Sequence, residues 1–186
     1  MREMAQRIVN GVMYAMESAQ TEIVWSPDFQ HQAGPLELPA RKVTDEEAAE
    51  AQAEATKLLA SGDVVPGSGD AALLRRAKGV VERYQNQGEA PVYTMDQHIL
   101  RLGDIAMATN PFELYLDYGL QIKARSRAEQ TFLIQLANDR GAYLPTQAAL
   151  PGGAYSSRIA DNKVGPEGGA ALVEETVTAI NAMWPV

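Results

Sequence analysis

The spacing of apolar residues along the chain predicts helices at both ends and in the middle. Apolar side chains recur at three- and four-residue intervals near the amino terminus, which is typical of an amphipathic helix. Thr44-Asp45-Glu46-Glu47 has the pattern of a capping box, so a second helix is expected to start there. Asp70 is expected to cap the third. The predicted helices are residues 2–19, Thr44 to about Ala60, Ala71 to about Tyr84, about Phe112 to Lys123, and about Pro166 to Trp184, with a loop at 61–70.

Three further segments have the pattern of strands. Residues 35–43 read as an edge strand in which proline limits pairing, and residues 91–109 read as two strands around Gly103-Asp104. Residues 131–137 (TFLIQLA) are almost continuously apolar, which indicates a strand buried on both faces. The strand ending near Thr109, the following helix and this strand form a βαβ unit, so the two strands should be parallel.

These elements predict an α/β fold with a mixed sheet that contains at least one parallel βαβ unit and is flanked by helices. We expect residues 1–186 to form one domain. The first helix carries an apolar stripe that needs cover, a sign that the chain is the later part of something longer. We therefore predict an incomplete half of a larger domain.

Composition excludes several classes of protein. The net charge of −8 argues against nucleic-acid binding, which needs a basic surface. No apolar run reaches the roughly 18 residues of a membrane span. The absence of cysteine rules out disulfides, thiolate metal sites and a cysteine nucleophile. The amino terminus lacks the features of a signal peptide, and the compartment stays open.

Ligands of parallel α/β sheets bind at the carboxyl ends of the strands. Two segments follow such ends, Asn110 to Glu113 and residues 137–146, so Glu113 and Tyr143 are expected on one rim. Local rules favour a helix-capping role for Glu113, with Asn110 as N-cap and Pro111 at the first helical position. A metal-binding role is the second interpretation, and for Tyr143 a half-buried loop tyrosine is the local one.

Other candidate groups carry little signal. Ser156 and Ser157 lie outside a G-x-S-x-G motif, and the glycine-rich 151–158 loop lacks the pattern of a nucleotide-binding loop. His31 and His98 are 67 residues apart without metal-ligand spacing, so they are interpreted as surface or edge histidines rather than ligands.

Three segments together resemble the neutral/alkaline ceramidase family, and more narrowly its shorter bacterial members. They are LRLGDIAMATNPFELYLDYGLQIKARS, TFLIQLANDRGAYLPT and GGAYSS. In that family a strand of the form LRLGDLA leads into P-G-E, and a later strand leads into A-N-x-x-x-x-Y, followed by a second tyrosine. Order and spacing agree over residues 98–184, whereas residues 1–60 match only the variable preceding segment.

The resemblance implies a zinc-dependent amide hydrolase that cleaves N-acyl sphingosine to fatty acid and sphingosine. It implies that Glu113 and Tyr143 are at the zinc and that Tyr155 helps to hold the substrate amide oxygen. The family's zinc histidines come from an amino-terminal half that would be this chain's partner, so the chain alone should bind zinc weakly and turn over little substrate. Family members are often secreted or periplasmic.

Two observations keep other functions open. Phenylalanine (Phe112) stands where the family has glycine, and it could crowd the site. A non-catalytic relative with a structural or partner-binding role is therefore the alternative. A hydrolase of a different amide on the same scaffold is a third, because fold and metal site do not determine the acyl chain or the amine.

Overall fold

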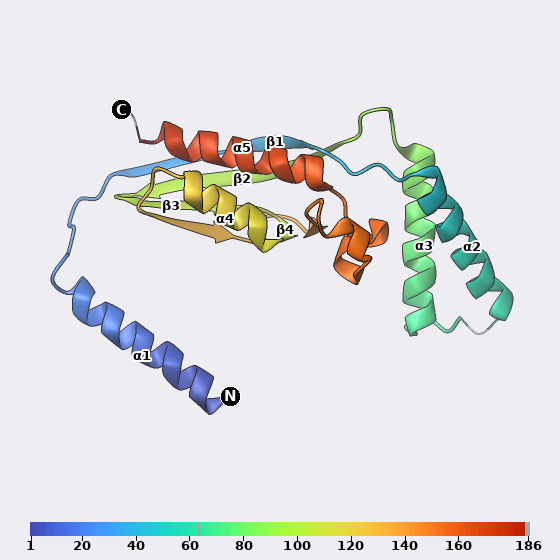
Figure 1. Cartoon of the computed structure of the whole chain (residues 1–186), viewed down its shortest axis with the longest axis horizontal. Coiled ribbons are helices and arrows are strands. Elements are labelled where there is room, and N and C mark those ends of the chain that lie inside the picture. Colours follow the sequence, from blue (N-terminus) through green and yellow to red (C-terminus); the bar gives the residue numbers. More distant parts are fainter. Residues whose placement is uncertain (63, 185–186) are drawn as a thin grey trace.

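A mixed sheet with helices on one face forms the centre of the computed structural model, which describes residues 1–62 and 64–184. The strand order is β1-β2-β3-β5; β1, β2 and β3 are antiparallel neighbours, and β3 and β5 are parallel. Helices α4 and α5 lie together on one side of this sheet (Figure 1). The strands of the sheet are β1 (Phe29–Pro39), β2 (Val92–Leu102), β3 (Ile105–Thr109) and β5 (Gln130–Ile134); the helices are α4 (Leu116–Arg125) and α5 (Pro166–Ala182).

The parallel βαβ unit predicted from sequence is confirmed as β3-α4-β5. Ile105 pairs with Gln130 at one end of the two strands and Thr109 with Ile134 at the other. The main core lies between this sheet and helices α4 and α5. Its largest fully buried side chains include Leu38, Ile99, Phe112, Ile122, Leu144, Leu172 and Ile180.

A helical hairpin projects from one end of the sheet (Figure 1). Its helices are α2 (Asp45–Ser61) and α3 (Gly69–Asn86). The predicted capping box is present, since the Thr44 hydroxyl accepts a hydrogen bond from the Glu47 amide at 3.2 Å and a Glu47 carboxylate oxygen accepts from the Thr44 amide at 3.1 Å. The N-cap of α3 is Ser68, not the predicted Asp70, because the Ser68 hydroxyl accepts from the Ala71 amide. Residue 63 of the predicted 61–70 loop lies outside the described residues.

Several predicted boundaries were wrong. The edge strand is β1, which starts six residues before the predicted start at residue 35 because it pairs with β2 along its whole length. Helix α4 starts at Leu116, and the residues before it form strand β4 (Phe112–Leu114), which pairs in parallel with β6 (Ala142–Leu144). Strand β5 ends at Ile134, and α5 ends at Ala182.

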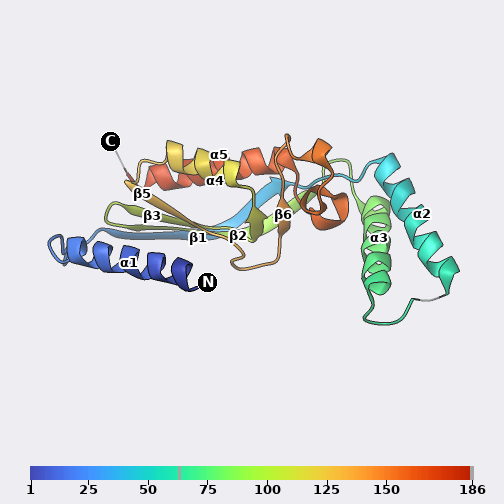
Figure 2. The same cartoon turned by 60° about the horizontal axis from the view of Figure 1, so that its bottom comes forward.

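One face of the sheet is open, contrary to the prediction of a strand buried on both faces. Side chains alternate along β5, so Thr131 is buried under the helices whereas Phe132 and Ile134 on the other face are each 45% exposed. Leu102 and Phe29 are exposed as well. The reason is that α4 and α5 cover only one side (Figure 2).

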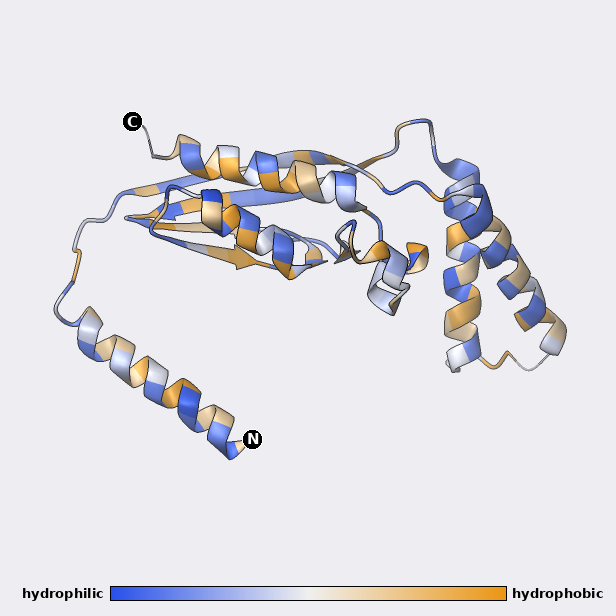
Figure 3. Cartoon of the chain, in the orientation of Figure 1, coloured by the Kyte–Doolittle hydropathy of each residue, from blue (hydrophilic) through white to orange (hydrophobic). Residues whose placement is uncertain are grey.

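Helix α1 (Arg2–Ala19) forms as predicted, but none of its residues is buried. It lies apart from α4 and α5, on the opposite side of the sheet (Figure 2). Apolar residues recur along it (Figure 3), and Met4, Ile8 and Val12 are all more than half exposed. The apolar stripe of this helix is therefore uncovered in this chain. In the described residues, every helix is too short or too polar to span a membrane.

Candidate active site

Glu113 lies in the short strand β4, where it pairs with Tyr143 of β6. Successive side chains of a strand point to opposite faces. Phe112 and Leu114 are buried in the main core, so the half-buried Glu113 side chain is directed away from it. Neighbouring strands lie about 4.8 Å apart, which places the side chains of Glu113 and Tyr143 next to each other.

The helix-capping interpretation of Glu113 was wrong. The Asn110 side-chain oxygen accepts a hydrogen bond from the Phe112 amide at 3.1 Å, which makes a local turn rather than a helix start. The chain then extends because β6 supplies a pairing partner. Long-range pairing thus overrides the local N-cap and proline signals.

Tyr155 joins the pair from a different segment, the single turn η2 (Tyr155–Ser157). The hydroxyl oxygens of Tyr143 and Tyr155 are 3.4 Å apart, and the two rings meet edge to face with centroids 5.4 Å apart. Tyr155 is 62% exposed. Glu113, Tyr143 and Tyr155 therefore form one cluster, with Tyr143 in the middle and Tyr155 outermost; below we call it the Glu–Tyr–Tyr cluster.

The contacts of the cluster favour the neutral form of Tyr143. Hydrogen bonding to the Tyr155 hydroxyl, and then to the Glu113 carboxylate, raises the pKa of Tyr143 above its ordinary value. Each interaction stabilises the protonated phenol relative to a phenolate beside a carboxylate. At neutral pH the arrangement therefore offers one carboxylate acceptor and two O–H donors.

The contact between Glu113 and Tyr143 can be tested by pH titration. In Glu113→Gln, removal of the carboxylate should lower the pKa of Tyr143 toward about 10, the ordinary value. Ultraviolet absorbance of phenolate should then show one of the seven tyrosines ionising at lower pH than in the parent. The same change in a Tyr143→Phe background should produce no such shift; an identical shift there would contradict the contact.

The raised pKa of Tyr143 also makes the stability of the protein depend on pH in a definite direction. A group whose folded pKa is raised contributes stability that is fully present below its unfolded pKa, here about 10, and is lost as pH rises through the folded pKa. The stability of the parent should therefore fall more steeply above about pH 10 than that of Tyr143→Phe.

Phe112 does not lie on the Glu113 side of its strand. Its ring is fully buried, and it packs 5.5 Å from the ring of Tyr93 between centroids. A Cβ atom on Gly141 would lie 2.4 Å from the Phe112 ring, so glycine at 141 is what leaves room for the phenylalanine.

The loop between β5 and β6 has an unusual backbone that the sequence did not reveal. Leu136, Asn138 and Ala142 have positive φ angles of 55°, 67° and 60°. Positive φ is uncommon outside glycine, and it is strained for leucine. The Asp139 carboxylate accepts a hydrogen bond from the Tyr93 hydroxyl at 2.6 Å, which ties the loop to the sheet.

A buried asparagine supports the tyrosines from behind. Asn162 is 1% exposed, and its amide nitrogen donates to the carbonyl oxygens of Tyr143 at 3.2 Å and Ser156 at 2.9 Å. Its side-chain oxygen accepts from Arg41 at 2.5 Å. Because Ser156 directly follows Tyr155, this one side chain links the backbones that carry both tyrosines.

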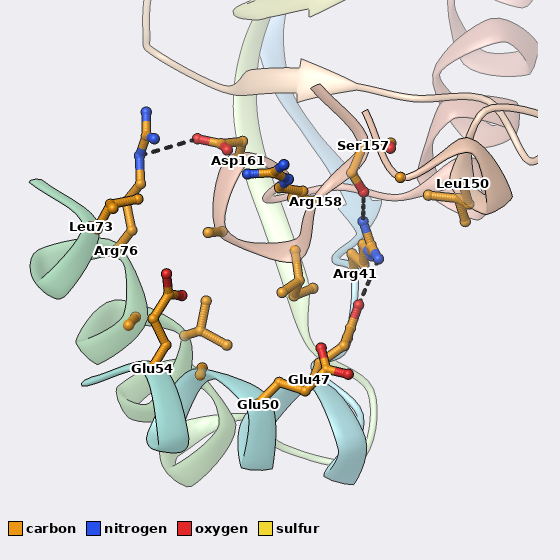
Figure 4. A pocket seen from close by; sticks show the side chains of 16 residues that line it. Arg41, Glu47, Glu50, Glu54, Leu73, Arg76, Leu150, Ser157, Arg158 and Asp161 are labelled. Atoms are coloured by element: carbon orange, nitrogen blue, oxygen red, sulfur yellow. Dashed lines mark hydrogen bonds and ion pairs between the residues drawn. The ribbon is translucent and has the colours of Figure 1, made fainter. Parts of the chain in front are cut away.

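Two arginines extend this support to the helical hairpin. Arg41 also donates to the Ser157 carbonyl at 2.8 Å and pairs with Glu47 of α2 at 2.7 Å (Figure 4). Arg83 of α3 donates to the carbonyl oxygens of Asn162 and Arg41. Burial, more than the nearby Arg41 charge, lowers the pKa of Arg83 from its ordinary value. We call Arg41, Arg83 and Asn162 the hairpin clamp; no sequence motif pointed to it.

A cleft of about 340 Å³ lies between the hairpin and the segment that follows Tyr155. Seven of the sixteen residues that line it are charged (Figure 4). Arg76 of α3 pairs across the cleft with Asp161 at 3.5 Å. The charged residues that line it are Arg41, Glu47, Glu50, Glu54, Arg76, Arg158 and Asp161.

The fold and the Glu–Tyr–Tyr cluster define a mixed α/β protein with a polar site at the carboxyl ends of parallel strands. Its fold matches a neutral ceramidase from Pseudomonas aeruginosa with a TM-score of 0.51 and 17% identity, over 91% of this chain and 31% of that one. A ceramidase complexed with C2 also matches, with a TM-score of 0.43 and 18% identity, over 56% of this chain and 20% of that one.

The chain thus spans about a third of the length of the Pseudomonas protein, and it shares the fold of that part. The resemblance to neutral ceramidases predicted from sequence is supported by this fold. No family model and no curated protein matches the chain.

Proposed function

We propose that the chain is the carboxyl-terminal part of a zinc-dependent amide hydrolase of the neutral ceramidase type. The observation that carries the proposal is the Glu–Tyr–Tyr cluster. The residues that the resemblance assigns to the metal and to the substrate oxygen come from three separate segments, and they are neighbours at one rim. The substrate would be an N-acyl sphingosine, cleaved to fatty acid and sphingosine.

The residues present fit part of a zinc site. A carboxylate oxygen is an ordinary zinc ligand, and catalytic zinc sites use about three protein ligands and keep an open position. In residues 1–62 and 64–184 there is no group of three or more His, Asp or Glu side chains that could hold a metal. Glu113 and Tyr143 would therefore supply their share, and an amino-terminal half the remaining ligands.

Open apolar surface supports the need for a second half. Phe132 and Ile134 on the sheet, and the stripe of α1, are exposed in this chain. Several large apolar side chains exposed on one side of a protein favour an interaction site there. A partner that packs on the open face would bury these residues and place its own ligands beside the sheet.

Each residue of the cluster has a distinct role in this proposal. When bound, zinc would supply a water molecule of lowered pKa and polarise the amide carbonyl. Glu113 would anchor its side of the metal. The exposed Tyr155 hydroxyl would donate to the carbonyl oxygen as negative charge develops there. Tyr143, held between its two neighbours, would lie at the metal beside Glu113 and would orient Tyr155. The hairpin clamp would hold both tyrosine backbones.

The experiment is amide hydrolysis by this chain joined to the amino-terminal half that the proposal requires. N-acyl sphingosine should be cleaved in the presence of zinc, whereas the chain alone should show little or no turnover. Tyr155→Phe in the joined protein should lower kcat about 10²–10³-fold, the usual effect of removing one oxyanion donor, with a small change in KM. A joined protein that binds zinc but cleaves no amide would favour the non-catalytic alternative.

A further inference from the structure

The two histidines of the chain, which the sequence separates, are in contact on the open face of the sheet. Nε2 of His31 and Nδ1 of His98 are 3.0 Å apart, and the rings are stacked with centroids 5.2 Å apart. The pairing of β1 with β2 brings them together, since Ala33 is opposite His98 and His31 is opposite Leu100. His31 is exposed and His98 half-buried.

We propose that His31 and His98 form a clamp that binds a divalent transition-metal ion such as Ni²⁺ or Cu²⁺. This site is separate from the Glu–Tyr–Tyr cluster, and it does not rest on the proposed function.

The distance between His31 Nε2 and His98 Nδ1 suits two ligands of one metal ion. Metal–imidazole bonds are about 2.0–2.1 Å long, so two cis ligands of one ion have nitrogens about 2.9–3.4 Å apart for angles between a right angle and tetrahedral. The observed 3.0 Å is within this range. The strands already hold both rings close together. Binding requires side-chain rotation and the tautomer in which both facing nitrogens are unprotonated, without movement of the sheet.

The ligand type and the charge around the two histidines also favour a transition-metal cation. Neutral imidazole is a preferred ligand of Cu²⁺, Ni²⁺ and Zn²⁺, and in the usual affinity order Cu²⁺ binds most tightly. Asp96, two residues before His98 on the same face of β2, is exposed, and the chain carries a net charge of −8. Both attract a cation. Two protein ligands leave several coordination positions for water, so in this chain by itself the clamp is an open, exchangeable site.

His98 is also fixed from behind. Its backbone amide donates to the hydroxyl of Thr109 at 2.9 Å, which ties this position of β2 to the end of β3. Since β1 is the edge strand, an ion held between His31 and His98 would cross-link the edge to the interior of the sheet. Binding to the folded state alone raises the free energy of unfolding with the logarithm of the ligand concentration once that exceeds the dissociation constant.

The test uses the full 186-residue chain titrated with NiCl₂ and followed by the NMR signals of the histidine rings. The chain has only two histidines, so these signals report the clamp directly. Both should broaden together, and the melting temperature should rise with Ni²⁺ concentration. Loss of an outer-shell partner typically weakens a metal site about 10–100-fold, and loss of a ligand in His31→Gln or His98→Gln should cost at least as much.

Two matched variants test whether the ion binds to the His31–His98 pair rather than to a carboxylate. Asp96→Asn and Glu113→Gln should each retain Ni²⁺ binding that broadens both histidine signals. Histidine signals that stay sharp in a large excess of Ni²⁺ would overturn the proposal. So would equal Ni²⁺ affinity in the His31→Gln/His98→Gln double variant, or loss of binding in Asp96→Asn.

Discussion

Asn162→Leu should lower the free energy of unfolding by about 3–5 kcal/mol. Leucine has the same branched side-chain shape but makes no hydrogen bonds. The change would leave the carbonyl oxygens of Tyr143 and Ser156 without this donor and remove an acceptor from Arg41. An unsatisfied buried group costs about 1–3 kcal/mol, and a hydrogen bond to a charged group contributes about 1.5–3 kcal/mol. Urea unfolding measures the difference.

Asn110 offers a matched control. It is also a buried asparagine, and its side-chain oxygen accepts one hydrogen bond, from the Phe112 amide. Asn110→Ala should therefore cost only about 1–2 kcal/mol. If Asn162→Leu costs no more than this control, the hairpin clamp does not hold the segments that carry Tyr143 and Tyr155.

Phe112→Ala should lower the free energy of unfolding by about 3–5 kcal/mol, the usual cost of truncating a buried phenylalanine. The ring is fully buried between Tyr93 and Gly141, so its loss would leave a cavity in the main core. The site should not benefit, because the side chain is directed away from Glu113. Thermal or urea unfolding measures the first effect, and zinc affinity of the joined protein measures the second.

Gly141, which lies against the Phe112 ring, allows a double-mutant cycle. Gly141→Ala alone should cost about 1–3 kcal/mol, because its Cβ would overlap the Phe112 ring. In Phe112→Ala the added methyl group would enter the vacated space, so the two costs should not add. A gain in zinc affinity on Phe112→Ala would instead revive the idea that this residue crowds the site.

Much of the fold could be predicted because local patterns and the main contacts agree. The β3-α4-β5 unit follows from strand and helix periodicity together with the rule that such strands are parallel. The capping box at Thr44 and the amphipathic helix over residues 2–19 depend on nearby residues alone. Boundaries were wrong where long-range pairing decided the outcome, as at β4 and at the start of β1.

The prediction for the strand at residues 131–137 was wrong for a different reason. Its sequence is apolar on both faces, but this chain supplies helices for only one of them. The apolar side chains on the open face of this strand would be buried in an assembly that covers that face, as the proposed amino-terminal half would.

The candidate site was predictable only through motifs at the ends of strands. Glu113 and Tyr143 were placed on one rim from topology, and the resemblance added Tyr155. The hairpin clamp and the His31–His98 contact could not be found in this way. Both depend on residues far apart in sequence, brought together by sheet register and by a hairpin that docks on the turns after Tyr155.

The most direct test of the central claim is the zinc content of the joined protein, with and without Glu113→Gln, in a His31→Gln/His98→Gln background. This background removes the second metal site proposed above. We predict stoichiometric zinc in the parent and strongly weakened binding in Glu113→Gln, with little loss of stability, since Glu113 caps no helix. Equal zinc affinity in the two proteins would contradict a role for the Glu–Tyr–Tyr cluster as part of a zinc site.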